Sequence, residues 1–118
     1  MHDVDSSVEK TPQVCLTALV PAAAEDRVVD WLLTHPDWQI EFSLHTVAAR
    51  GPLVRLDLSE EQVQGFAHRV ELKMIIARSQ LDALLAALEP LLAGLDGGYW
   101  VLPVERFAAF GTINADKK

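Results

Sequence analysis

The histidines of this sequence are its best candidates for chemistry, and their spacing decides what they could do. His45 and His68 lie on either side of a long polar segment, so a metal ion held between them is the first hypothesis. If the flanking stretches are paired strands, however, the alternation of side chains puts the two imidazoles on opposite faces of the sheet. A metal at His45 would then need ligands from another subunit, because one imidazole does not make a site.

Motifs for covalent or cofactor chemistry are missing from the sequence. It contains no C-x-x-C, G-x-G-x-x-G, P-loop or nucleophile elbow. Glu60 and Glu61 are adjacent, as in the first turn of a helix, which favours a structural role over an acid–base pair. Cys15 lies in an apolar run, where a lone cysteine is usually a small buried hydrophobe. We therefore expect a protein that is not an enzyme.

Composition narrows the class further. A chain of 118 residues fits one domain with a genuine core. The net charge of −7 and the scattered arginines argue against nucleic-acid binding, which needs a basic face. A single cysteine excludes a disulfide within the chain and favours a reducing compartment. Residues 1–12 lack the apolar segment of a secretory signal, and no apolar run approaches the ~20 residues of a membrane span. We expect a cytoplasmic protein that does not insert into membranes.

Hydrophobic periodicity predicts six elements. A continuous apolar run and two alternating stretches predict strands, and a stretch rich in aromatic and β-branched residues, which contains Pro103, predicts a fourth. Pro21 and Ser79 each stand where a helix should begin, and Pro36 and Pro90 where it should end or kink. The predicted strands are 13–20, 38–47, 68–77 and 97–106, the predicted helices are 22–35 and 79–90, the domain spans 13–106, and 1–12 and 107–118 are predicted tails.

The order of these elements predicts the fold. Strand, helix, strand, strand, helix, strand is the split βαβ pattern of an α+β, ferredoxin-like domain. Two right-handed crossovers give an antiparallel sheet of order 4-1-3-2 with both helices on one face. Strand 97–106 then lies at the sheet edge, where Pro103 removes no necessary hydrogen bond. Pairing Ile40 with Met74 would place Glu41 opposite Lys73.

The sheet face away from the helices is expected to be apolar, which indicates assembly through that face. An alternative is that the closing "FAAFGTI" (107–113) folds back over it. The residues that we assign to an oligomer interface are Cys15, Thr17, Leu19, Tyr99, Trp100 and Leu102.

The segment 48–65 is the best binding element, because it is far longer than a hairpin connection requires and long loops in compact domains are usually functional. Ser59 and Gln62 have the spacing of a capping box, which predicts a short helix over 60–64 ended by Gly65. A solvated loop or a clasp between subunits is the alternative. The residues assigned to a ligand or partner here are Arg50, Gly51, Arg55, Glu60 and Glu61.

Five stretches resemble a small PII-like family of unknown function in proteobacteria, whose members are often encoded beside heavy-metal efflux pumps. The resemblance covers nearly the whole predicted core. It rests on "VCLTALVP" (14–21), "VVDWLLTHP" (28–36), "LSEEQVQGFAHRVELKMII" (58–76), "LDALLAAL" (81–88) and "YWVLPV" (99–104).

That resemblance implies a ferredoxin-like protomer, a homotrimer whose sheets face inward, and a long hairpin loop that signals to a partner. The partner would be a component of a membrane efflux system. Nucleotide phosphates bind between subunits in PII proteins, in a glycine-rich basic loop before the second helix. The corresponding stretch here, "IIARSQL" (75–81), has Arg78, which we assign to that role, but no glycine, so the resemblance leaves nucleotide binding open. His45 would serve a divalent metal.

The leading hypothesis is therefore a non-enzymatic PII-like regulator that acts through 48–65, with a link to metal tolerance. Ferredoxin-like sheets also dimerise into α+β barrels that act as cofactor-free monooxygenases, and Trp38, His68 and Trp100 would be the candidates for that chemistry. A purely structural oligomeric module is the third reading.

Overall fold

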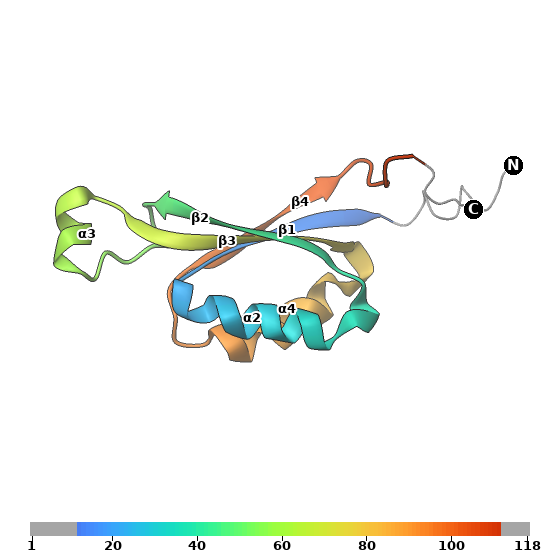
Figure 1. The fold of residues 1–118 in the computed structure, drawn as a ribbon, viewed down its shortest axis with the longest axis horizontal. Coiled ribbons are helices and arrows are strands. Elements are labelled where there is room, and N and C mark those ends of the chain that lie inside the picture. Colours follow the sequence, from blue (N-terminus) through green and yellow to red (C-terminus); the bar gives the residue numbers. More distant parts are fainter. Residues whose placement is uncertain (1–11, 112–118) are drawn as a thin grey trace, which may run out of the picture.

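Four antiparallel strands form the sheet, in the order β2-β3-β1-β4, in a computed structural model that describes residues 12–111 (Figure 1). This confirms the predicted order and places β4 at an edge. The strands are β1 (Gln13–Val20), β2 (Glu41–Ala49), β3 (Ala67–Ala77) and β4 (Gly98–Val104). The tails predicted at 1–12 and 107–118 lie largely outside the described residues.

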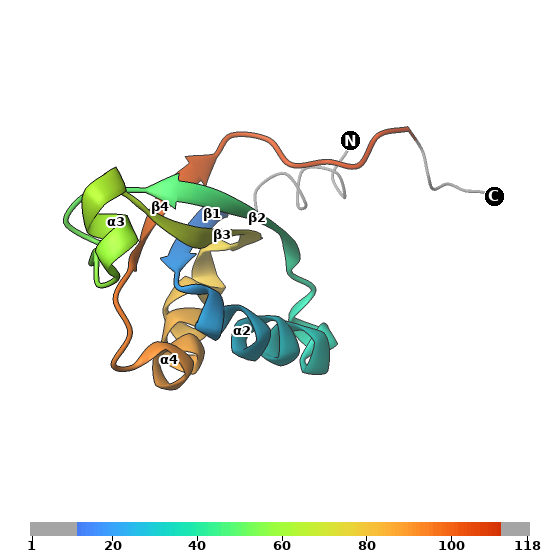
Figure 2. The same ribbon diagram turned by 60° about the vertical axis from the view of Figure 1, so that its left-hand side comes forward.

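Helices α2 (Ala22–Thr34) and α4 (Leu81–Leu92) lie on the same side of the sheet (Figures 1 and 2). The alternate positions of β1 and β3 that point to this side are buried, as the periodicity requires. The helices contribute the rest of the core. Its buried members are Val14, Leu16, Ala18, Val20, Ala24, Val28, Leu32, Val70, Leu72, Met74, Ile76, Leu84 and Leu88.

The element ends differ from prediction where short turns intervene. Pro36–Trp38 form a 3₁₀ turn, and Gln39 adopts a left-handed conformation with φ 54°. Strand β2 therefore begins at Glu41 instead of residue 38, and the Trp38 ring packs edge-on against Trp31 with centroids 5.4 Å apart. A second 3₁₀ turn, Arg78–Gln80, likewise delays α4 to Leu81.

Helix α4 runs through Pro90 to Leu92. Proline at this point removes one hydrogen bond near the end of the helix, where the last turn is already weakly held, so the helix continues for two more residues.

The register of β2 on β3 differs from the predicted one by two residues. Phe42 faces Met74, and His45 faces Glu71. The predicted pairing of Glu41 with Lys73 is wrong: Glu41 lies opposite Ile75, and Lys73 lies opposite Ser43. A shift of two residues keeps every side chain on its face, so His45 and His68 do lie on opposite faces.

The sheet face away from the helices, the open face, has an apolar half over β1 and β4. Trp100 lies opposite Thr17 and Leu102 opposite Cys15, while Trp100 and Leu102 remain 38% and 56% exposed. Tyr99 faces the helix side, opposite Ala18, because neighbouring strand residues alternate. It therefore does not share the face of the other predicted interface residues.

Two of those residues are already covered within the protomer. Thr17 is 2% exposed and Leu19 is 7% exposed. The surface left for a second subunit therefore centres on Trp100 and Leu102. Residues 107–111, the described part of the segment that could have folded over this face, leave the Phe110 side chain 98% exposed.

Candidate functional site: the β2–β3 loop and its anchor

The loop between β2 and β3 is folded and carries a short helix of its own, α3 (Ser59–Gln64), at the end of the sheet that projects past α2 and α4 (Figure 1). The helix predicted over 60–64 is confirmed. Gly65 ends it with φ 85° and donates its N–H to the Glu61 carbonyl at 2.7 Å. Glycine adopts this left-handed conformation without the penalty that a Cβ imposes.

The start of α3 is capped one residue earlier than predicted. Leu58 is the N-cap, and the Glu61 carboxylate accepts hydrogen bonds from the N–H groups of Asp57 and Leu58 at 3.0 and 3.1 Å. Gln62 instead donates its side-chain amide to the Leu56 carbonyl at 3.0 Å. The prediction that Ser59 and Gln62 form a capping box is therefore wrong. A carboxylate at the positive end of a helix is a stronger acceptor than a neutral amide.

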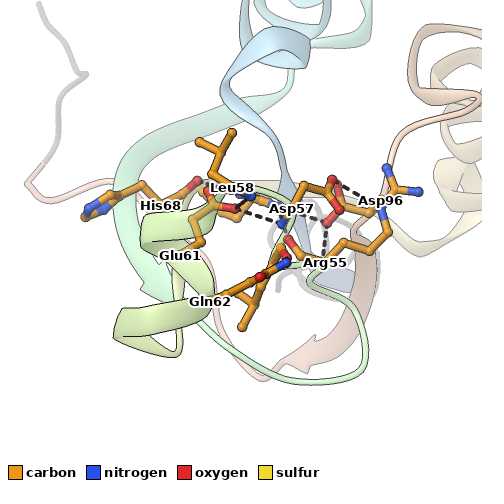
Figure 3. Close-up of polar contacts among 9 residues, drawn as sticks. Arg55, Asp57, Leu58, Glu61, Gln62, His68 and Asp96 are labelled. Atoms are coloured by element: carbon orange, nitrogen blue, oxygen red, sulfur yellow. Dashed lines mark hydrogen bonds and ion pairs between the residues drawn. The ribbon is translucent and has the colours of Figure 1, made fainter.

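A buried arginine anchors the loop to the sheet. Arg69 of β3 is 8% exposed, and its Nη2 donates to the Arg55 carbonyl at 2.9 Å and to the Asp96 Oδ2 at 3.1 Å. The same Asp96 oxygen accepts the backbone N–H of Arg55 at 2.9 Å (Figure 3). Three segments distant in sequence thus meet at one carboxylate: the loop, β3 and the turn before β4. We call this set of contacts the Asp96 clasp.

Two carboxylates, those of Glu61 and Asp96, lie near the Arg69 guanidinium, but one of its nitrogens has no hydrogen-bond partner among the described residues. Glu61 Oε2 lies 4.0 Å from Arg69 Nη1, and the Glu61 and Asp96 side chains are only 17% and 11% exposed. Burial opposes ionisation of Asp96, but the hydrogen bonds from Arg55 and Arg69 and the charges of both arginines outweigh it, so the pKa of Asp96 lies below its ordinary value. Within residues 12–111, Arg69 Nε has no hydrogen-bond partner.

Apolar contacts also hold the loop against the sheet. The Leu53 methyl carbons would lie within 2.9 Å of a Cβ at Gly98, so the leucine packs directly on the β4 backbone. Gly98 is the register partner of Leu19, whose burial on the open face this contact helps to explain. Arg50 extends over Gly65, where a Cβ would come within 2.9 Å of its Nη1.

The residues that the sequence assigned to one ligand or partner site fall into two places. Arg50, Gly51, Arg55, Glu60 and Glu61 all belong to the loop. Arg78 lies at the other end of β3, where its N–H donates to the Pro12 carbonyl at 2.9 Å. The structure therefore does not bring Arg78 to the loop.

Arg69 and Asp96 were not among the functional residues predicted from the sequence. In the sequence, Arg69 is only a basic residue in a predicted strand, and Asp96 is only an acidic residue in a glycine-rich turn. Both patterns are common, so neither points to a functional residue. Nothing in either pattern pairs residues 27 positions apart in sequence.

His45 pairs with a neighbouring carboxylate. Its Nε2 lies 3.1 Å from Glu71 Oε1, which also lies 3.9 Å from Lys73 Nζ, and the His45 side chain is 47% exposed. One protomer thus offers two ligand groups at this point. The described residues hold no cluster of three or more histidine, cysteine or acidic side chains that could bind a metal.

The candidates for oxygenase chemistry lie apart from one another. Trp100 is on the open face. His68 packs against Phe66 with ring centroids 5.8 Å apart, at the loop end of β3. Trp38 lies in the turn before β2, against Trp31. One protomer therefore does not gather them into a pocket.

Comparison with known proteins gives a family and a fold. A family model described as a protein of unknown function, DUF3240, matches residues 10–114. The structure of a DUF3240 family protein from Shewanella baltica superposes with a TM-score of 0.65 at 19% identity, covering 85% of this chain and 97% of the other. Arabidopsis thaliana PII bound to citrate superposes with a TM-score of 0.61 at 16% identity, covering 86% of each chain. No curated protein sequence matches this chain. Over residues 12–111, no helix has the length and apolarity needed to cross a bilayer.

Proposed function

This chain belongs to the DUF3240 family and has a PII-like fold, and on that premise we propose that it is a non-enzymatic regulator that acts by protein contact through the β2–β3 loop. The observation that carries the proposal is that the loop is folded and yet exposes apolar side chains. It is anchored by a buried arginine and extends beyond the helices.

The exposed side of the loop has the composition of a contact surface. Val63 on α3 is 86% exposed, and Leu58 just ahead of the helix is 56% exposed. Arg55, three residues before Leu58, is 62% exposed, so the loop also presents a basic group to solvent. Exposed apolar groups on a rigid projection favour protein binding, because a partner gains their burial without having to order the loop.

Assembly into a homotrimer through the open face is part of the proposal. Its support is the apolar half of that face, with Trp100 and Leu102 at its centre, and the likeness to PII. The partner that we propose to test first is a component of a heavy-metal efflux system, as the family resemblance implies. Metal or nucleotide binding would have to be completed by a neighbouring subunit.

A pair of matched variants tests the contact surface. Wild type, Val63→Asp and Leu33→Asp are immobilised and exposed to extracts that contain efflux components. Leu33 is 64% exposed on α2, away from the loop, so it controls for a new surface charge. We expect one protein to be retained by wild type and Leu33→Asp and to be lost with Val63→Asp. Arg50→Ala and Arg55→Ala should weaken the same interaction.

Native mass spectrometry of each variant reports assembly in the same experiment. A trimer in all variants, with binding lost only in the loop variants, supports the proposal. Equal retention by Val63→Asp and wild type contradicts a loop contact, and a monomeric wild type contradicts assembly through the open face.

A further inference from the structure

A groove of about 550 Å³ lies between α4 and the strands β1 and β4, on the helix side of the sheet. Its volume is within the ~300–1,000 Å³ typical of small-molecule sites. The groove lies on the face of the sheet opposite Trp100 and Leu102, so assembly through the open face would leave it accessible. Its lining includes Leu16, Val20, Leu85, Leu92, Leu95 and Tyr99.

The charges of the lining restrict the occupant. Glu89 and Asp96 are the ionisable acids in it, and it contains no lysine, arginine or histidine. A phosphate or carboxylate would meet only like charge here and would lose its hydration without compensation. An apolar molecule whose polar end is uncharged or cationic suits the groove, because its body can bury aliphatic surface and its end can approach the Glu89 carboxylate.

One short turn belongs both to the groove and to the loop anchor. Leu95, Asp96, Gly97, Gly98 and Tyr99 form one end of the groove. In this segment, Asp96 of the turn accepts hydrogen bonds from Arg55 and Arg69, and Gly98, the first residue of β4, supports Leu53. The turn therefore cannot shift toward or away from α4 without changing the contacts that hold the loop.

We propose that the groove binds a small apolar molecule with an uncharged or cationic end, and that the Asp96 clasp transmits its occupancy to the β2–β3 loop. A ligand that fits one position of the turn better than another shifts the population of loop positions by that difference in affinity. The consequence for partner binding rests on the proposed function; ligand binding and the change in the loop do not.

The first experiment tests the site with the neutral fluorophore N-phenyl-1-naphthylamine. Ala86 is an exposed residue of the groove, whereas Ala83, also exposed on α4, is not part of it. We expect Ala86→Trp to raise the Kd of the probe at least tenfold and Ala83→Trp to leave it within twofold. Below their micelle concentrations, dodecyltrimethylammonium should compete and dodecyl sulfate should not. Equal probe binding by the two tryptophan variants, or better competition by the anion, overturns the site.

The second experiment tests transmission by hydrogen exchange at the Arg55 amide, which donates to Asp96. Saturating probe should change its exchange rate at least threefold in wild type. In Asp96→Ala, which removes the acceptor of that amide, the change should be absent at probe concentrations that saturate the variant. An unchanged rate in saturated wild type overturns the coupling. Because Val63 is not part of the groove, failure here and failure of the partner test are distinguishable.

Discussion

Replacing Asp96 with alanine removes the acceptor of the Asp96 clasp without touching the folded core. The variant loses the hydrogen bonds from the Arg55 N–H and from Arg69 Nη2. Arg69, 8% exposed in the intact protein, is left with Glu61 at 4.0 Å as its remaining carboxylate. Breaking a buried ion pair costs about 3–5 kcal/mol when no charge compensates. Since Glu61 compensates in part, we expect the free energy of unfolding to fall by about 2–3 kcal/mol.

Urea unfolding measures this loss. For a domain of this size, a urea dependence of about 1.5 kcal/mol per molar converts the loss into a midpoint about 1–2 M lower. All variants are compared at one protein concentration, because an oligomer gains stability with concentration. Hydrogen exchange at the Arg55 amide should accelerate in parallel, since its acceptor is gone.

Asp57→Ala is the matched control. Asp57 pairs with Arg55 at 3.6 Å, but both side chains are more than 60% exposed, so the expected loss is below about 0.5 kcal/mol. The double variant Asp96→Ala with Arg69→Met should recover part of the stability, because the buried guanidinium is gone, while Glu61, 17% exposed, loses its cationic neighbour. Equal midpoints for Asp96→Ala and Asp57→Ala, or no recovery in the double variant, would refute the reasoning.

The pKa of Asp96 lies below its ordinary value of 3.8, so the clasp stabilises the fold above that pH and loses its effect as pH falls through the lower folded pKa. Urea midpoints of wild type and Asp96→Asn should therefore differ at pH 7 and converge in strong acid; a constant difference contradicts this. Gly97→Ala should prevent folding or cost more than about 3 kcal/mol, because φ is 119° and a Cβ would overlap the Leu19 carbonyl oxygen. Gly51→Ala, with φ 139° and open space, carries only the backbone cost of about 1–2 kcal/mol, and a smaller loss for Gly97→Ala than for Gly51→Ala in thermal melts would contradict the clash. His45→Gln should cost less than about 1 kcal/mol, since the His45 side chain is 47% exposed; a larger shift in urea midpoint would indicate a buried role in the assembly.

The strand pattern was readable because side-chain alternation is a local property. The apolar run 13–20 coincides with β1, and Pro103 marks β4 as an edge strand. The loop helix was expected from Gly65 and from the spacing of Ser59 and Gln62, and it forms although Leu58 and Glu61 make the cap instead. These features depend on torsion angles and on neighbours within a few residues, which the sequence states directly.

Register was predictable only in part. The parity of β2 against β3 follows from which face is apolar, so the separation of His45 from His68 was determined by the sequence. The two-residue shift could not be predicted, because it goes with the turn at Pro36–Trp38, which forms just before β2. Trp38 belongs to that turn and not to the strand, and its ring packs on Trp31.

By itself, then, the sequence determined the order of elements, the sheet topology, the exposed apolar face and the loop as the element to test. Tertiary structure alone decided that Arg69, Arg55 and Asp96 meet, that Arg78 lies apart from them, and that the turn at Asp96 borders a groove. The physical reason is the distance along the sequence between the residues that interact. Periodicity and caps are fixed by residues one to four positions apart, whereas a hydrogen bond between distant segments exists only after the loop, β3 and the α4–β4 turn have packed together.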